Sequence, residues 1–370
     1  MWGVWHRGQK KSADFPGAQP VWSKPLSDTL SDIRPSLGRG VPRPEIRGAE
    51  VFHNGQNAAR PPVEARKATL GDYDRKLASA FGKAGHGVNW VLKKLTESLS
   101  DPFREIPQKP DYRAQVLAMP APERRYAMFF TPRSGSSRLT ELADQTKVLG
   151  RPGEIFNPAL LPKIAVHYGA QSMGDYIDLL CRARNHDGTF GCQITYSQIL
   201  SRFRTGHRFL DAVEPTHVIW LYREDIVAQA VSISRMRQTR LGHATAATAA
   251  IEADAEARFV YDPRAIRRII RFLRWMETRT EALFRREGLQ PLRLSYEQSI
   301  AHPPMAVLAA MAGHLGVDLD PGVEIVEKHR KLSGSKGRSF AEQFRAENAD
   351  FVARIEQQRA PMLARLTDLG

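Results

Sequence analysis

The stretch from residue 126 to residue 156 constrains the fold of this chain more than any other. It begins with an apolar, aromatic-rich run, Tyr126–Thr131, which is typical of a strand buried on both faces of a parallel sheet. A glycine- and serine-rich turn follows, and then apolar residues recur at helical spacing from Leu139 to Leu149. The pattern predicts a strand, a tight turn, a helix and a return strand over 147–156. An extended return segment is long enough to bring Glu154 back beside the turn.

The turn between the predicted strand and helix has the composition of an anion-binding site. Its residues are Pro132, Arg133, Ser134, Gly135, Ser136 and Ser137. A helix that begins at Ser136 or Ser137 directs its unsatisfied N–H groups toward the turn, and Gly135 lets the backbone approach a ligand. The dipole of an exposed helix end contributes only about 0.3–1 kcal/mol, so we expect Arg133, the amides and the hydroxyls to supply most of the binding. A serine-capped helix without a ligand is the alternative.

A nucleoside-triphosphate loop is the obvious competitor for this turn. It requires the spacing G-x-x-x-x-G-K-[ST], and this turn has neither that spacing nor its lysine.

A second strand-to-helix unit follows in the middle of the chain. The apolar run His217–Tyr222 predicts a strand, and the segment after Arg223 predicts a helix that extends to about Met236. A helix turns by about 100° per residue, so Arg223 and Ser232 would lie on opposite sides of one helix. Arg223 must therefore precede the helix if both side chains are to face one ligand. The alternative role of Arg223 is an ion pair with a neighbouring acid.

The remaining pattern predicts further helices and strands in alternation. Helices are expected at 173–184, 264–287 and 340–366, strands at 189–196 and 292–297, and two short amphipathic helices between 70 and 100. Strands that alternate with helices indicate an α/β fold, in which a central parallel sheet carries helices on both faces. Such folds bind ligands at the carboxyl ends of the strands.

Thr-Pro-Arg-Ser-Gly-Ser-Ser, the helix after it and the segment 150–156 (Gly-Arg-Pro-Gly-Glu-Ile-Phe) together resemble a known family. They are similar to the sulfotransferases that use 3′-phosphoadenosine 5′-phosphosulfate (PAPS), in particular the trehalose 2-sulfotransferase and lipopolysaccharide sulfotransferase family. The similarity covers roughly residues 125–345. It implies a P-loop-like sulfotransferase fold and transfer of a sulfuryl group from PAPS to a hydroxyl of a carbohydrate or glycolipid, without a metal.

The resemblance also implies roles for individual residues. Glu154 would be the catalytic base, although a surface acid beside Arg151 is the alternative. Arg133 would take part in both catalysis and donor binding. The donor-binding set implied by the resemblance is Arg133, Ser134, Gly135, Ser136, Ser137, Arg223, Ser232, Tyr296, Gly337 and Arg338, the last two in a basic loop that closes over the 3′-phosphate.

Gln193 departs from the family pattern, which usually has a lysine at this position. Its amide can donate a hydrogen bond but supplies no positive charge. Arg133, Arg151 or another group would then have to compensate, or activity would be altered. His167 and His186 are alternative bases.

The charge of the chain indicates an acidic partner. A net charge of +14 and a pI near 10.0 suit a phosphorylated cofactor, a nucleic acid or an anionic membrane surface. The arginine-rich segment 264–287 lacks a recognised nucleic-acid motif, so we expect no nucleic-acid partner. A basic protein that binds nucleic acid or anionic lipid is one alternative function. A sulfotransferase-like protein that binds nucleotide without catalysis, suggested by Gln193, is another.

The remaining expectations concern location and organisation. The two cysteines, Cys181 and Cys192, provide neither a disulfide framework nor a four-ligand metal site, and the first residues lack the apolar core of a signal peptide. We expect a cytoplasmic protein. Composition predicts an irregular, flexible or surface-wrapping extension at 1–65, and helical spacing predicts a helical linker region at 66–122. The resemblance implies that the sulfotransferase domain covers 123–370. The segment 88–99 would permit peripheral membrane contact, and the family analogy permits a homodimer.

Overall fold

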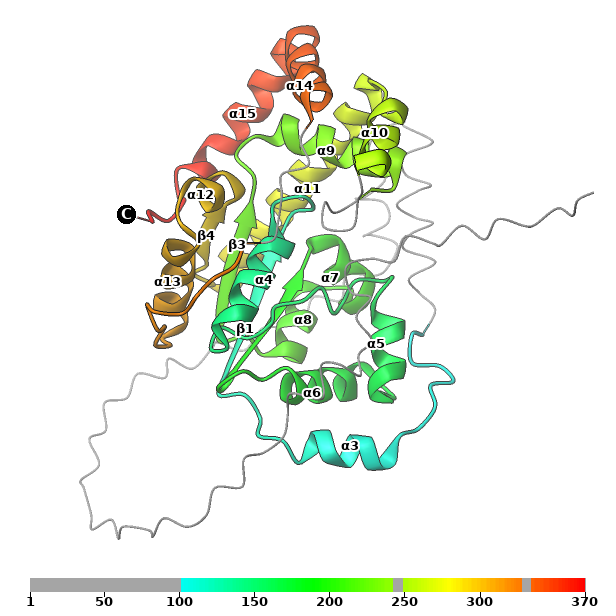
Figure 1. Cartoon of the computed structure of the whole chain (residues 1–370), viewed down its shortest axis with the longest axis vertical. Coiled ribbons are helices and arrows are strands. Elements are labelled where there is room, and N and C mark those ends of the chain that lie inside the picture. The colour runs from blue at the N-terminus through cyan, green and yellow to red at the C-terminus, as the bar shows by residue number, and fades with distance from the viewer. Residues whose placement is uncertain (1–100, 242–248, 328–333, 370) are drawn as a thin grey trace, which may run out of the picture. The chain divides into compact units, whose positions relative to one another are not determined.

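The computed structural model describes residues 101–241, 249–327 and 334–369. The predicted extension at 1–65 and the two helices predicted between 70 and 100 lie outside the described residues. The described elements, shown in Figure 1, are α3 Pro110–Leu117, β1 Arg124–Phe130, α4 Ser136–Thr146, α5 Leu161–Tyr168, α6 Met173–Ala183, β2 Thr189–Ile194, α7 Tyr196–Phe203, α8 Gly206–Val213, β3 His217–Tyr222, α9 Ile226–Thr239, α10 Ala249–Arg258, α11 Pro263–Glu287, β4 Leu292–Ser295, α12 Tyr296–Ala301, α13 Pro304–Leu315, α14 Ser335–Glu347 and α15 Ala349–Leu363.

The four strands form one parallel sheet in the order β2-β1-β3-β4. The predicted α/β fold with a central parallel sheet is therefore confirmed. From β1 the chain passes first to β2 on one side and later to β3 on the other, so the order reverses between β1 and β3. In open α/β sheets, ligands bind in the crevice outside the carboxyl ends of the strands at this switch point. The loops that follow β1 and β3 meet this condition.

Strand β1 is buried on both faces, as its apolar composition predicts. Ala127 and Phe129 pack into a cluster with the helices α5 to α8 and the end of α11. Tyr126, Met128 and Phe130 point to the opposite face, where they contact α4 and α13. Each fully buried large apolar side chain contributes about 1.5–3 kcal/mol, so the alternation anchors β1 between two helical layers. The loop after β1 consequently begins from a rigid base.

A third apolar cluster joins α9, α11, α14 and α15. The helical stretch predicted at 340–366 is confirmed as far as Leu363, and it consists of two helices, α14 and α15, that meet at Asn348. The Asn348 amide donates to Phe344 O at 3.1 Å, and its Oδ1 accepts from Arg267 Nη1 at 3.1 Å. The break turns both Phe344 and Phe351 into the cluster with α11.

The predicted return strand over 147–156 is also wrong. Among the described residues, this segment pairs with the sheet only through a bridge between Gly153 and Cys192. Two residues explain why the pairing does not extend beyond this bridge. Gly150 has φ of +69°, which is not an extended conformation, and Pro152 has no N–H to donate. The segment still returns to the sheet, because Gln193 N donates to Gly153 O at 2.9 Å.

Two strands end earlier than the sequence pattern predicts. Thr195 and Gln198 form a capping box that begins α7 directly after β2, and Ser295 and Gln298 form one that begins α12 directly after β4. In each box the hydroxyl accepts from the N3 amide while the glutamine side chain accepts from the N-cap amide. Tyr296 therefore opens a helix rather than continuing the strand.

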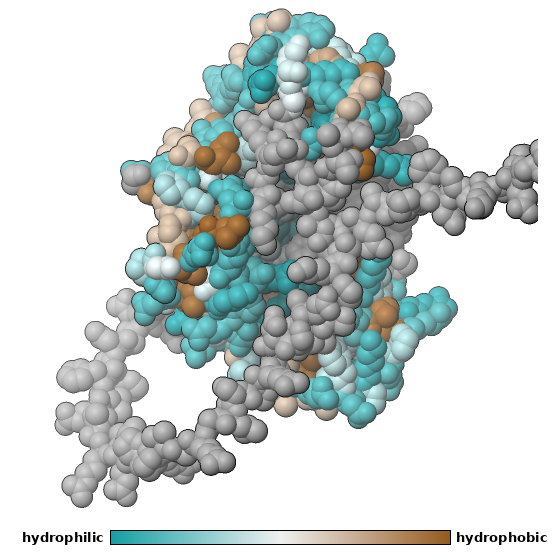
Figure 2. Space-filling model, in the orientation of Figure 1, coloured by the Kyte–Doolittle hydropathy of each residue, from teal (hydrophilic) through white to brown (hydrophobic). Residues whose placement is uncertain are grey.

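On the face shown in Figure 2, the visible described residues are mainly hydrophilic, and hydrophobic residues form small separate patches. The large apolar side chains that are exposed come from different elements and loops: Leu117, Val166, Ile251, Val260, Ile300 and Val326. Among the helices that the structure describes, none combines the length and the apolar character needed to cross a membrane.

Candidate donor and catalytic site

The β1–α4 loop contains two residues in the left-handed backbone region. Arg133 has φ of +66° and Gly135 has φ of +83°. Glycine is required at the second position, because a Cβ there would lie 2.7 Å from Cδ2 of Tyr296. Gly135 is also the N-cap of α4 and provides no capping side chain. The first N–H groups of α4 therefore receive no hydrogen bond from a capping side chain, and an anion at this helix end would be a suitable partner.

The same loop contains a buried hydroxyl without a partner. Ser134 is fully buried, and its Oγ has no hydrogen-bond partner within the described part of the chain. The loop beside it is held by Gln229, whose Nε2 donates to Thr131 Oγ1 at 2.8 Å and to Pro132 O at 2.7 Å. A buried polar group without a partner costs about 1–3 kcal/mol. A ligand oxygen at this position would remove that cost.

The Arg133 side chain lies among other positive charges. Its Nε donates to Ser232 Oγ of α9 at 3.1 Å. Burial lowers the pKa of Arg133, and the nearby guanidinium groups of Arg223 and Arg235 lower it further, whereas Tyr296 raises it. A guanidinium stays protonated even so, because its ordinary pKa is above 12. The mutual repulsion of these cations would be relieved by a bound anion.

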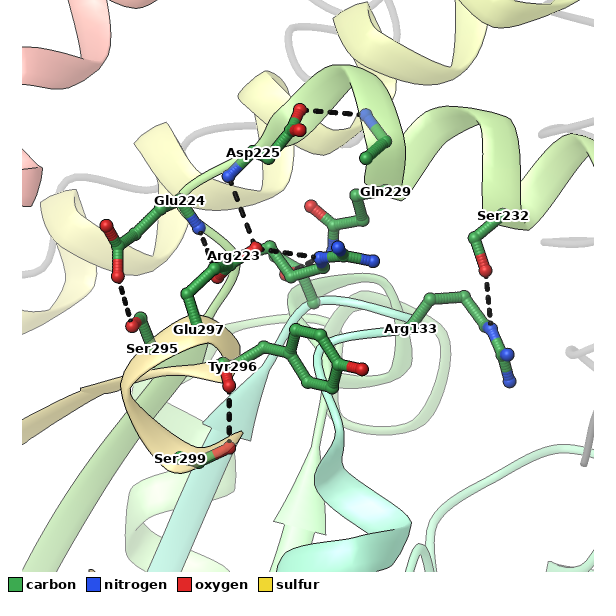
Figure 3. Close-up of polar contacts among 12 residues, drawn as sticks. Arg133, Arg223, Glu224, Asp225, Gln229, Ser232, Ser295, Tyr296, Glu297 and Ser299 are labelled. Atoms are coloured by element: carbon green, nitrogen blue, oxygen red, sulfur yellow. Dashed lines mark hydrogen bonds and ion pairs between the residues drawn. The ribbon is translucent and has the colours of Figure 1, made fainter. Parts of the chain in front are cut away.

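Arg223 lies before α9, as the helical geometry requires. Its Nε donates to Glu297 Oε1 at 3.1 Å, and its guanidinium carbon lies 4.5 Å from the centroid of the Tyr296 ring. Glu297 also accepts from the backbone N–H of Glu224 at 2.8 Å. The carboxylate thereby ties the β3–α9 loop to the first turn of α12. Figure 3 shows the side chains of the β1–α4 loop, the β3–α9 loop, α9 and α12 gathered at one place.

Glu154 lies in the segment that returns from α4 to β2. Its Oε2 accepts from Asn157 Nδ2 at 2.8 Å and from Gln198 Nε2 at 3.4 Å. Burial raises the pKa of Glu154, and the two amide hydrogen bonds partly offset that rise. Arg151, the neighbour considered as an ion-pair partner from the sequence, lies instead 3.6 Å from Asp144. A carboxylate with a raised pKa is a stronger base near neutral pH.

Gln193 connects the Glu154 segment to the anion-binding loop. Its Nε2 donates to Ser136 O at 2.9 Å and also to Thr140 Oγ1. Thr140 Oγ1 in turn donates to Pro152 O at 2.7 Å. The first turn of α4, strand β2 and the 147–156 segment are therefore joined by one hydrogen-bond network. Gln193 acts in this network as a neutral donor.

The predicted basic loop around Gly337 and Arg338 is wrong in conformation. Ser335 begins α14, so both residues lie in the first turn of a helix. Lys336 Nζ donates to Glu256 O of α10 at 2.7 Å. The remaining loop residues, 328–333, lie outside the described residues. The proposed contact of Gly337 and Arg338 with the 3′-phosphate stays a prediction.

The two histidines named as alternative bases each lie near a polar side chain. His167 Nε2 lies 3.2 Å from the Tyr112 hydroxyl, and burial lowers the pKa of this imidazole. His186 Nδ1 lies 3.8 Å from an Asp144 oxygen. Within the described residues there is no group of three or more His, Cys, Asp or Glu side chains that could hold a metal ion.

Several residues of this site are not among those predicted from the sequence. Gln229 and Arg235 lie three residues before and after Ser232, so helical spacing alone places all three on one face of α9. Asn157 and Gln198 carry no local signal, because their importance depends on a contact with Glu154 made across the fold. Glu297 stood in a segment predicted as strand.

The protein has an α/β fold, a glycine- and serine-rich loop with arginines at its switch point, a half-buried carboxylate in the segment that leads to β2, and no lysine of the nucleoside-triphosphate loop. These features fit a group transferase. A family model described as Stf0 sulphotransferase matches residues 125–347, more than half of the chain. The protein therefore belongs to the Stf0 sulphotransferase family, and this membership supports sulfotransferase activity. A search of curated proteins found no match. The family match begins in β1 and ends with α14, so α15 lies beyond it.

Proposed function

We propose that this protein transfers a sulfuryl group from PAPS to a hydroxyl of a carbohydrate or glycolipid. The observation that carries the proposal is the convergence of Arg133, Ser232 and Arg223 at the switch point, next to an unpartnered Ser134 hydroxyl. Both PAPS and its product adenosine 3′,5′-bisphosphate carry phosphate at two positions of one adenosine. A site with two arginine-bearing loops and a helix N-terminus matches that charge distribution.

The chain's groups divide naturally between the two ends of such a donor. Ser134, Gly135 and the amides of Ser136 and Ser137 would hold the 5′-phosphosulfate, with Arg133 stabilising negative charge that develops on the departing phosphate. Arg223 and Ser232 would hold the 3′-phosphate. When bound, the donor supplies the sulfuryl group, whose bond to the 5′-phosphate oxygen breaks as the acceptor oxygen bonds to sulfur.

The ring of Tyr296 would border the adenine. The Cδ2 part of the ring packs against Gly135 of the β1–α4 loop, and the Arg223 guanidinium carbon lies 4.5 Å from the ring centroid. An aromatic ring held between these two loops offers a flat apolar surface to a nucleobase, and base–aromatic stacking is worth about 1–3 kcal/mol.

Glu154 would take the proton of the attacking hydroxyl. Its environment favours this role, because burial raises the pKa of the carboxyl while Asn157 and Gln198 fix one oxygen. The second oxygen is then the one to accept the proton. A positioned carboxylate base typically contributes about 10²–10⁴-fold to a rate.

Arg133 would provide the positive charge that the family lysine supplies elsewhere. Gln193 uses its amide to hold Ser136 and Thr140, and Arg151 lies beside Asp144. Arg133, in contrast, belongs to the anion-binding loop itself and hydrogen-bonds to Ser232.

A transfer assay with ³⁵S-labelled PAPS tests the proposal. The acceptors are trehalose, a panel of other saccharides, and purified lipopolysaccharide or extracted glycolipids, so that free and lipid-linked sugars are distinguished. We expect label in one of these classes with the wild type and with Glu141→Gln, an acid on α4, but not with Glu154→Gln. A wild type that binds adenosine 3′,5′-bisphosphate yet labels none of the acceptors would favour a nucleotide-binding protein without catalysis. Gln193 makes that second function worth testing.

A further inference from the structure

The last helix, α15, reaches the donor-binding loops although it lies beyond the family match. Its Arg359 is only 1% exposed, and its guanidinium donates to the backbone carbonyl oxygens of Arg223 and Glu224. These are the first two residues after β3. One guanidinium therefore spans the turn from which the Arg223 side chain projects, and Figure 1 shows α15 in red running from α14 toward α12.

Arg359 is itself fixed by a buried carboxylate. Its Nε lies 3.2 Å and 3.1 Å from the two oxygens of Glu277 on α11, and its Nη2 lies 2.9 Å from Oε1. Glu277 is fully buried and also accepts from Arg274 Nη1 at 2.5 Å. Arg274 points elsewhere, toward Gln358 O at 3.4 Å. The two arginines thus share one acid, but of these two only Arg359 hydrogen-bonds to the β3–α9 loop.

The C-terminal segment after α15 also contacts β4 and the start of α12, which carries Tyr296. Thr367 N donates to Arg293 O at 2.9 Å and Thr367 Oγ1 accepts from Arg293 N at 3.1 Å, so the chain after α15 pairs with β4. Thr367 O accepts from Gln298 Nε2 at 2.9 Å, and Gln298 caps the helix that carries Tyr296. The same C-terminal segment therefore contacts both loops that bring Arg223 and Tyr296 together.

We propose that Arg359 is a positioning residue for the donor: it holds the Arg223–Glu224 backbone so that the Arg223 side chain lies against Tyr296 and toward Arg133. The role rests on the proposed function, since it assumes that Arg223 binds the donor's 3′-phosphate. A planar guanidinium can donate to two carbonyl oxygens at once, and a lysine cannot reproduce this geometry. The loop should accordingly lose its fixed position when Arg359 is replaced, even if the charge is kept.

The test compares Arg359→Lys with Arg274→Lys and Ile355→Ala. Each lysine variant keeps a cation beside Glu277, so neither leaves that acid unpaired, and Arg274→Lys is the matched control without a loop contact. Ile355→Ala removes an apolar side chain of α15 from the cluster that joins α9, α11, α14 and α15. This variant controls for lost stability. Calorimetry with adenosine 3′,5′-bisphosphate is performed under conditions in which urea titration shows that every variant is folded.

We expect Arg359→Lys to weaken binding of adenosine 3′,5′-bisphosphate about 3- to 30-fold, and both controls to stay within about twofold of wild type. Amide hydrogen exchange gives a second readout that needs no ligand. Exchange of the Glu224 and Asp225 amides should accelerate in Arg359→Lys but not in either control. A purely structural role would change all three variants in proportion to their stability.

The outcomes separate the inference from the function on which it rests. Unchanged amide exchange at Glu224 and Asp225 in Arg359→Lys overturns the positioning role, whether or not the affinity for adenosine 3′,5′-bisphosphate changes. Accelerated exchange with unchanged nucleotide affinity overturns it as well, because the loop would then move without consequence for binding. A wild type that does not bind adenosine 3′,5′-bisphosphate overturns the proposed function and, with it, the donor-related role of Arg359.

Discussion

The two sides of the candidate site are built in different ways. On the proposed donor side, the loops after β1 and β3 bring guanidinium groups together, and Glu297 holds one of them in place through an ion pair and a backbone hydrogen bond. On the proposed acceptor side, one oxygen of Glu154 accepts from the neutral amides of Asn157 and Gln198, in a segment attached to the sheet by a bridge at Gly153. The first arrangement suits the binding of phosphate, and the second keeps a carboxylate basic.

This difference has a physical reason. A phosphate group needs fixed positive charge, which repels itself until the ligand arrives. A catalytic carboxylate placed next to the same cations would have a depressed pKa and would be a poor base. Neutral hydrogen-bond donors hold Glu154 and lower its pKa less than burial raises it. Substitutions on the two sides should therefore separate catalysis from donor binding.

The largest expected effect is on turnover in Glu154→Gln. The amide keeps the shape of the side chain but cannot accept a proton, so turnover should fall by about 10² or more. The affinity for adenosine 3′,5′-bisphosphate should stay nearly unchanged, because Glu154 belongs to the acceptor side. Steady-state kinetics and calorimetry on the same preparation measure the two quantities. Unchanged turnover would remove Glu154 from the mechanism.

Ser134→Ala should produce opposite changes in stability and in binding. Loss of the unpartnered buried hydroxyl should stabilise the free protein by up to about 1 kcal/mol, while donor affinity should fall several-fold, by about 0.5–1.5 kcal/mol. Urea unfolding and calorimetry measure the two changes.

Thr189→Val is the matched control for this pair of changes. Thr189 Oγ1 is also buried and without a partner among the described residues, but it lies at the opposite end of β2 from the site. This variant should gain stability with no effect on affinity. Equal affinity losses in both variants would show that Ser134 acts through folding rather than by binding.

Substitutions of Asn157 should shift the pH dependence of the reaction. The Asn157 hydrogen bond lowers the pKa of Glu154, so Asn157→Ala should raise that pKa and move the acidic limb of kcat/KM to higher pH. Asn157→Asp should move it further, because a second carboxylate disfavours ionisation of the first. The pH of the acidic limb should rise from wild type to Asn157→Ala to Asn157→Asp. The reverse order would contradict the assignment of Glu154 as the base.

The smallest effect concerns stability. Burial raises the pKa of Glu154 in the folded protein, so this carboxyl favours folding only while it is protonated, and that contribution is lost as the pH rises through the folded pKa. Glu154→Gln should therefore be more stable than wild type at pH 8, and the difference should shrink toward pH 5. Urea unfolding across this range measures it. A difference that is constant with pH would show that the pKa is not raised.

The elements that the sequence predicts correctly are those set by local pattern. The apolar run of β1, the turn at Gly135 and the start of α4 at Ser136 follow from neighbouring residues alone, and so does the placement of Arg223 before α9. The early ends of β2 and β4 were also readable, since Thr195 and Ser295 each have a glutamine three residues later.

What could not be predicted depends on contacts made across the chain. The amides around Glu154 come from α7 and from a turn after the bridge, and Arg359 reaches the β3–α9 loop from the end of the sequence. The return strand predicted over 147–156 does not form, because Gly150 is not extended and Pro152 cannot donate to a ladder.

Calorimetry with two nucleotides tests most directly whether the loops after β1 and β3 form one site for a doubly phosphorylated adenosine. Wild type should bind adenosine 3′,5′-bisphosphate at least about tenfold more tightly than adenosine 5′-monophosphate, since hydrogen bonds to charged groups contribute about 1.5–3 kcal/mol. Arg223→Ala should remove that preference and leave the monophosphate affinity unchanged. Equal affinities of the wild type for the two nucleotides, or a preference that survives in Arg223→Ala, would contradict the account.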